Sequence, residues 1–182
     1  MDEEEALASF LDKPIAVGVI LLLLVHFGAR LVYVPSRSML DTLHVHDVLV
    51  VDCLHYRLAS PTRGEIAVFY EPSASWWRAP LLVKRIVALD GDKVGIHKGQ
   101  LYINDEPQLE PYVAESLAPA LGGRQPIQAD FSDRQVAPRC FFALGDNRGN
   151  SLDSRSYGDV PLGNLVGLVR ARVWPSSRIA IF

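Results

Sequence analysis

The sequence predicts a mainly β protein with one N-terminal transmembrane helix. Two observations support this prediction. Residues 14–34 form an apolar run, and most of the remaining chain consists of short segments in which polar and apolar residues alternate. Gly, Pro, Asp and Asn separate these segments, and few stretches after residue 34 keep helical spacing for three turns. We therefore expect an antiparallel β domain that follows a membrane anchor.

The N-terminal segment is a short acidic tail, Asp2–Glu5, followed by the apolar run Pro14–Val34. As a helix, this run would be about 30 Å long, which is the thickness of a hydrocarbon core. A cleavable signal peptide is the competing interpretation, but the acidic start and the lack of an A-x-A site at its end disfavour it. We predict an uncleaved tail and anchor over residues 1–34 and a β domain over residues 35–182.

Alternating polarity predicts seven short strands in the β domain. Their ranges are Asp47–Leu54, Glu65–Tyr70, Leu81–Leu89, Lys93–Ile96, Gln100–Ile103, Arg139–Leu144 and Leu165–Val173. Between the fifth and sixth of these, the polar stretch Asn104–Pro138 contains five prolines and two glycines. We expect this stretch to be a loop-rich insertion at about residues 104–138.

Length and charge limit the possible functions. A chain of 182 residues is large enough for one domain with a real core, and its net charge of −3 gives no basic footprint for nucleic acid. We therefore expect no nucleic-acid partner. The two cysteines, Cys53 and Cys140, could form a disulfide or remain buried thiols, and the sequence does not decide between these states.

Three segments contain the residues with catalytic potential: Pro35–Leu43 (PSRSMLDTL), Leu81–Asp92 (LLVKRIVALDGD) and Gly145–Pro161 (GDNRGNSLDSRSYGDVP). Lys84 lies among aliphatic residues, and most lysines on such strands alternate outward to water. If its side chain points inward, desolvation lowers its pKa and makes a neutral amine available to activate a nearby serine. The last segment, taken alone, is equally compatible with a solvated loop closed by an ion pair.

Taken together and in this order, the three segments resemble the nucleophile, general-base and last sequence boxes of bacterial signal peptidase I. Members of that family are membrane-anchored serine endopeptidases that remove signal peptides from exported proteins. The matching residues are Ser38 and Met39, Lys84 and Arg85, and Gly145 to Arg155. The similarity runs from about Val32 to Pro175 and implies a coiled antiparallel β-sheet. It also implies a single-pass protein of the plasma (inner) membrane with its catalytic domain on the outer, periplasmic face.

The resemblance implies a role for each matching residue. Ser38 would be the nucleophile and Lys84 the general base, and the Ser36 hydroxyl and the Ser38 N–H would form the oxyanion hole. Ser151 would hydrogen bond to the Lys84 amine and orient it. Four further residues would have structural roles: Asp153 and Arg155 would form a salt bridge, and Asp146 and Arg148 would stabilise the last box in a similar way.

The resemblance also implies how the substrate binds. A preprotein signal peptide would add as a β-strand, and shallow pockets would accept small residues at the first and third positions before the cleaved bond. The residues expected to line these pockets are Val34, Met39, Leu43 and Leu82. Trp76 and Trp77 are either interfacial anchors in the bilayer or ordinary core aromatics. No cofactor is implied, and His44 and His46 lack a third ligand for a metal site.

Three residues depart from the family pattern: Asp41 and Asp90 replace prolines, and His46 replaces a glycine that precedes Asp47. A carboxylate at position 41, at ~8 Å from Lys84 and an effective dielectric of ~20, would favour the charged lysine. This would work against a lysine base.

The main hypothesis is a type I signal peptidase that uses a Ser–Lys dyad. A close alternative is a pilin- or conjugation-type maturation peptidase with the same chemistry. A third hypothesis is an inactive relative that binds signal sequences without cutting them. The joint presence of the serine nucleophile, the lysine and the residues around them favours an enzyme.

Overall fold

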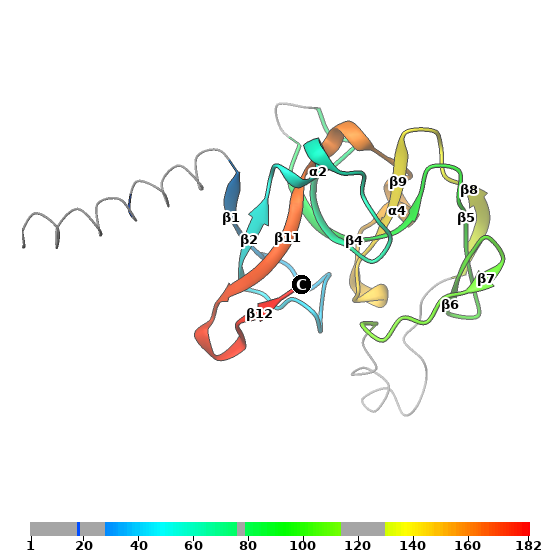
Figure 1. Cartoon of the computed structure of the whole chain (residues 1–182). Helices are drawn as coiled ribbons and strands as arrows, with labels where there is room; N and C mark the ends of the chain where they lie inside the picture. The colour runs from blue at the N-terminus through cyan, green and yellow to red at the C-terminus, as the bar shows by residue number, and fades with distance from the viewer. Residues whose placement is uncertain (1–17, 19–27, 76–78, 114–129) are drawn as a thin grey trace, which may run out of the picture.

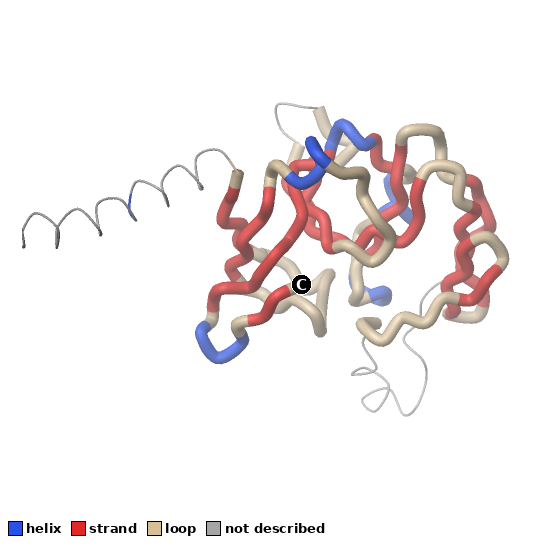
Figure 2. Tube along the Cα trace, in the orientation of Figure 1, coloured by secondary structure: helices blue, strands red, loops and turns tan. Residues whose placement is uncertain are grey.

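The computed structural model describes residues 18, 28–75, 79–113 and 130–182, and within these ranges the fold is mainly β, as predicted (Figures 1 and 2). The strands form a large sheet of order β1-β2-β11-β3-β4-β9-β10, with β12 paired to β11, and a small sheet of order β7-β6-β5-β8. All of the strand pairs are antiparallel. Figure 1 shows the small sheet beyond β4 and β9, away from β1.

The strands of the large sheet are β1 (Ala29–Tyr33), β2 (Val48–Asp52), β3 (Ile66–Tyr70), β4 (Leu81–Leu89), β9 (Cys140–Leu144), β10 (Val160–Pro161), β11 (Leu165–Trp174) and β12 (Ala180–Ile181). Those of the small sheet are β5 (Lys93–His97), β6 (Gln100–Ile103), β7 (Glu106–Pro107) and β8 (Phe131–Gln135). The short helices are α2 (His55–Leu58), η1 (Arg148–Asn150), α4 (Ser154–Tyr157), η2 (Leu162–Asn164) and η3 (Ser176–Arg178). The seven predicted strands are all present, and each end lies within two residues of its expected position.

The anchor helix predicted over residues 14–34 extends too far toward the C-terminus. Ala29–Tyr33 is strand β1, whose residues pair with β2 from Ala29↔Asp52 to Tyr33↔Val48. Pairing with a strand satisfies the backbone groups here, so the apolar sequence of this part serves a sheet and not a helix. The rest of the predicted helix, apart from positions 18, 28 and 34, lies outside the described residues. In the described ranges, no helix is long and apolar enough to cross a bilayer.

The insertion expected to be loop-rich contributes two strands, β7 and β8, to the small sheet. Strand β8 has four exposed residues out of five, and its Phe131 packs against the small-sheet core. Ion pairs from Lys93 and His97 to Asp133 join β8 to β5 across the sheet. A strand held by polar contacts with a single apolar residue has no alternating pattern, and for this reason the sequence does not reveal it.

Strands β4 and β9 separate two parts of the core. On β9, Phe141 and Ala143 face one hydrophobic cluster, and Phe142 and Leu144 face the cluster under the small sheet. A third cluster, which includes Met39, lies between the turn after β1 and strands β2, β3 and β11. Because β4 is buried on both faces over much of its length, it forms a rigid support for the side chains that it carries.

The cysteines are both free thiols, and each lies partly buried. Cys53 packs beside the cluster that includes Met39, and Cys140 packs beside the cluster under the small sheet. Burial raises the pKa of both thiols.

Strand β11 approaches β2 closely at Gly167, and this contact generates a stability prediction. A Cβ atom at this position would lie 2.5 Å from the Asp52 carbonyl oxygen and 2.7 Å from a methyl carbon of Val51. We expect Gly167→Ala to destabilise the fold by about 1–3 kcal/mol, since the strands must separate to accept the methyl group. Thermal unfolding of the full chain in detergent micelles, followed by circular dichroism, measures this. Gly163→Ala is the control, because its Cβ would meet nothing within 4 Å. Equal midpoints for the two variants would contradict the prediction.

Candidate active site

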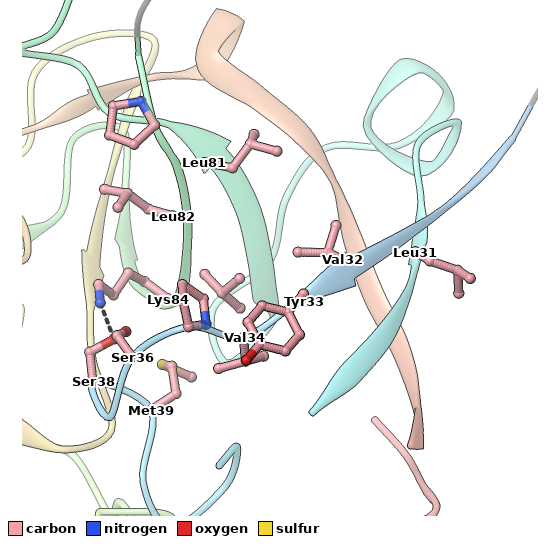
Figure 3. A pocket seen from close by; sticks show the side chains of 13 residues that line it. Leu31, Val32, Tyr33, Val34, Ser36, Ser38, Met39, Leu81, Leu82 and Lys84 are labelled. Carbon is pink, nitrogen blue, oxygen red and sulfur yellow. Dashed lines mark hydrogen bonds between the residues drawn. The ribbon is translucent and has the colours of Figure 1, made fainter. Parts of the chain in front are cut away.

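The structure brings Ser38 and Lys84 together. Ser38 lies in the turn after β1, and Lys84 is the fourth residue of β4. The Lys84 ammonium nitrogen donates a hydrogen bond to the Ser38 hydroxyl oxygen (Figure 3). The exposed fraction is 9% for Ser38 and 4% for Lys84, so the lysine points into the protein and not outward to water.

The surroundings of Lys84 favour its neutral form. Burial lowers the pKa of this lysine to about 8 from its ordinary value of 10.5. The charge of Asp153 acts in the opposite direction, the charge of Arg155 lowers the pKa further, and Asp146 raises it. With this pKa, roughly a tenth of the amine is unprotonated at pH 7 and can accept a proton, whereas an ordinary lysine has far less than about a hundredth in this form.

Hydrogen-bond donors stand beside the Ser38 hydroxyl. The Ser36 Oγ lies 3.3 Å from the Ser38 Oγ. Within the described ranges, the backbone N–H of Ser38 has no hydrogen-bond partner. An oxyanion that forms at a carbonyl attacked by Ser38 would find these two groups available as donors.

The last sequence box holds the turn that carries Ser38. The Asn147 N–H donates to the Ser38 carbonyl oxygen at 3.1 Å, and the Asn147 side-chain amide donates to the Arg37 carbonyl at 2.9 Å. Gly145 lies so close that a Cβ there would come within 2.4 Å of the Ser38 carbonyl oxygen. Any other residue at position 145 would push the two segments apart.

Buried ion pairs fix the box itself. Asp146 accepts two hydrogen bonds from the Arg85 guanidinium, at 2.9 and 2.6 Å, and one from the Thr42 hydroxyl at 2.6 Å. Asp153 accepts two from Arg155, both at 2.8 Å. Burial alone would raise the pKa of Asp153, but this arginine and the Gly145 N–H hold it below its usual range. The Asp153–Arg155 pair implied by the resemblance is therefore present, in a buried setting.

The partner of Arg148 is a residue that the sequence did not reveal. Its guanidinium forms a bidentate pair with Glu110, which belongs to the insertion, and also donates to the Gly145 carbonyl at 3.1 Å. Tyr112, from the same segment, lies under the Arg85 guanidinium at 3.8 Å. Because these contacts join residues far apart in the chain, local spacing could not predict them.

Ser151 does not take the position expected of it. Within the described ranges, no hydrogen bond joins its buried hydroxyl to Lys84, and this hydroxyl instead acts on Asp153, whose pKa it helps to lower. It lies against Gly145, where a Cβ atom would come within 2.2 Å of it. The side chain therefore packs against Gly145, and the role expected of it toward Lys84 stays a prediction.

A cavity of about 440 Å³ opens beside the dyad. Three of the four residues expected to line it, Val34, Met39 and Leu82, do so (Figure 3). Leu43 does not, because it is completely buried in the cluster beneath Met39. The remaining lining comes from the two strands and the turns beside them, namely Leu31, Val32, Tyr33, Pro35, Pro80, Leu81 and Val83, together with Ser36, Ser38 and Lys84.

The cavity shows how strongly the large sheet curls. Its walls belong to β1 and β4, although β2, β11 and β3 lie between these strands in the sheet order. Strand β1 pairs on one side only, with β2, and the first four residues of β4 pair only with β3. Two unpaired strand edges of the described fold therefore border the cavity.

The three departures from the family pattern are each accommodated. His46 has a φ of 74°, the left-handed region that glycine adopts most easily. Asp90 accepts a hydrogen bond from the Arg139 N–H at 2.7 Å. Asp41 is exposed, and the charges that act on Lys84 are those of Asp153, Arg155 and Asp146. Asp41 is not among these charges, and exposure to solvent weakens any interaction of its carboxylate with the lysine.

Two other expectations concern tryptophans and metals. Trp76 and Trp77 lie outside the described residues. His44 and His46 do not belong to any group of three metal-ligating side chains within the described part of the chain.

Comparison with known proteins agrees with this geometry. The family model described as "Signal peptidase, peptidase S26" matches residues 8–174. A signal peptidase I of Leptolyngbya laminosa is 36% identical over 92% of this chain and 80% of its own length. A signal peptidase I of Bacillus caldolyticus is 35% identical over 81% of this chain and 80% of its own length.

A solved structure of a signal peptidase I from Enterococcus faecalis is also similar, with 28% identity and a TM-score of 0.47, over 60% of this chain and 97% of that chain. The family match spans the turn that carries Ser38, the strand that carries Lys84 and the last box. The chain belongs to the signal peptidase family, peptidase S26.

Proposed function

We propose that the chain is a membrane-anchored serine endopeptidase that removes N-terminal signal peptides from exported preproteins. The observation that supports this most is the hydrogen bond between a buried Lys84, with a lowered pKa, and Ser38 at the end of an apolar cavity. Such a pair has the parts needed for acyl transfer. Family membership supports the same reaction class.

In the proposed reaction, neutral Lys84 takes the proton of the Ser38 hydroxyl while its oxygen attacks the scissile carbonyl carbon. The Ser38 N–H and the Ser36 hydroxyl stabilise the resulting oxyanion. The Lys84 ammonium then gives its proton to the leaving amine as the C–N bond breaks. In the second half, Lys84 takes a proton from the water that attacks the acyl carbon. It then returns this proton to the Ser38 oxygen as the ester C–O bond breaks, which releases the carboxylic acid product and regenerates both residues.

The substrate would bind as an additional strand between β1 and β4. Both strands offer unpaired backbone groups at the cavity, so main-chain hydrogen bonds can provide affinity. Val34, Met39 and Leu82 leave shallow apolar space, which suits small side chains such as alanine. We propose that these pockets take the first and third positions before the cleaved bond.

Membrane placement belongs to the same proposal. The apolar run that precedes β1 would cross the plasma membrane once and leave the β domain at the outer face. Ser38 follows β1 directly, so the nucleophile would lie near the membrane surface, where signal peptides leave the bilayer.

The dyad assignment predicts the effect of two substitutions. Ser38→Ala and Lys84→Ala should each reduce cleavage of a preprotein by at least about 10³-fold, because nucleophile and base act as one unit. Purified full-length protein, a preprotein and gel detection of the shortened product measure this. Lys98→Ala, in the exposed turn between β5 and β6, is the control and should retain full activity. Near-normal cleavage by either folded dyad variant would rule out the Ser–Lys mechanism, and an inactive wild type would favour the binding relative.

The pKa of Lys84 predicts the pH dependence. The base works only as a neutral amine, so kcat/KM should rise with pH and level off above a midpoint near the lysine pKa of about 8. Because Asp41 is exposed, Asp41→Asn should leave that midpoint within about 0.2 units of the wild-type value. A pH profile measured on a short peptide substrate provides the test. A midpoint that falls clearly in Asp41→Asn would show that this carboxylate does act on the lysine.

A further inference from the structure

Tyr33 and His46 form a pair at the rim of the cavity that the proposed mechanism does not use. Tyr33, the last residue of β1, lines the cavity and is 51% exposed (Figure 3). Its hydroxyl hydrogen bonds to Nδ1 of His46. The ring centroids lie 5.7 Å apart, and the ring planes are tilted by 50°. The tyrosine ring is thus tethered at its far end.

The turn that carries His46 is itself held in place. The His46 N–H donates to the Val34 carbonyl at 3.0 Å, and the Val34 N–H donates to the Asp47 carbonyl at 2.9 Å. Asp47 is completely buried and pairs with Arg172 and Arg178. His46 therefore has a fixed position relative to the end of β1, and it fixes the Tyr33 ring in turn.

Side chains alternate along β1, and this alternation determines which face of a bound peptide the Tyr33 ring would contact. Val32 and Val34 belong to the hydrophobic cluster that includes Met39, whereas Leu31 and Tyr33 are exposed on the opposite face. Figure 3 shows Leu31 and Val32 on opposite sides of the strand. Neighbouring strands in a sheet present their side chains with the same alternation. A peptide whose first and third residues face Val34 and Met39 thus places its second residue on the Tyr33 face.

We propose that Tyr33, positioned by His46, forms a recognition site for the second residue before the cleaved bond, and that the site favours a large apolar or aromatic side chain. This inference rests on the proposed mode of substrate binding. The exposed ring offers a flat apolar surface, and the tether removes part of the entropy cost of ordering it. An aromatic contact of this kind corresponds to about three- to tenfold tighter binding.

Peptide binding to the full-length Ser38→Ala protein in detergent micelles tests the proposal. Two peptides would carry alanine at the first and third positions and either phenylalanine or alanine at the second. We expect the phenylalanine peptide to bind about three- to tenfold more tightly by isothermal titration calorimetry. Tyr33→Ala should abolish this difference, and His46→Gly, which suits the φ of 74°, should reduce it. Both variants should weaken binding of the phenylalanine peptide more than binding of the alanine peptide.

In the active protein, a positioning role for His46 has a distinct kinetic consequence. His46→Gly should raise KM for the phenylalanine peptide more than for the alanine peptide, whereas kcat for each peptide should stay close to its wild-type value. The matched control is Tyr102→Ala in the small sheet, where the tyrosine ring lies 5.5 Å from that of His97. It should leave the preference intact.

Three results would overturn the proposal: equal affinities for the two peptides, an equal loss of affinity for both in Tyr33→Ala, or the same loss of preference in Tyr102→Ala. Because binding to the Ser38→Ala protein needs no cleavage, these results can be told apart from a failure of the proposed peptidase activity. That failure would instead appear as intact preprotein after incubation with the wild type.

Discussion

The burial of Lys84 is the constraint on which the rest of the site depends. Lowering the pKa of a lysine from 10.5 to about 8 corresponds to about 3 kcal/mol of unfavourable free energy for its charged form. The fold imposes this unfavourable free energy by placing Lys84 in the middle of β4. This strand is buried on both faces and pairs first with β3 and then with β9. A looser strand would let the ammonium reach water, and the lysine would return to its ordinary pKa.

Two buried carboxylates raise the pKa of Lys84 and so oppose the effect of burial. The fold limits how far they raise it by pairing each one with an arginine. Asp146 and Asp153 each form a two-point ion pair with an arginine, Arg85 and Arg155 respectively. The positive charge of Arg155 lowers the lysine pKa, while the aspartates raise it. The same ion pairs stiffen the box that holds the turn around Ser38, so positioning of the nucleophile and electrostatic tuning of the base have a common structural origin.

The parts of the fold that depend on local sequence rules could be predicted from the sequence. The alternating runs predicted the seven main strands, whereas the resemblance of three segments to the signal peptidase boxes pointed to Ser38, Lys84 and the Asp153–Arg155 pair. The features of the fold and site that could not be predicted from the sequence depend on contacts between residues far apart in the chain. Strand β1 has an apolar sequence that suits a helix equally well, Glu110 pairs with Arg148 across 38 positions, and Leu43 is buried because the turn folds over it. Asp41 was expected near Lys84 because it follows Ser38 closely in the chain, yet its side chain is exposed.

The most direct test of this account is the ionisation of Lys84 itself. The chain has four lysines, so ¹³C labelling of their ε carbons gives a simple NMR spectrum of the full-length protein in micelles, and Lys84→Met assigns the signal of interest. We expect this signal to titrate with a midpoint near 8, well below the ordinary lysine value. A midpoint near the ordinary lysine value of about 10.4 would show that Lys84 stays charged at working pH and would contradict the proposed base.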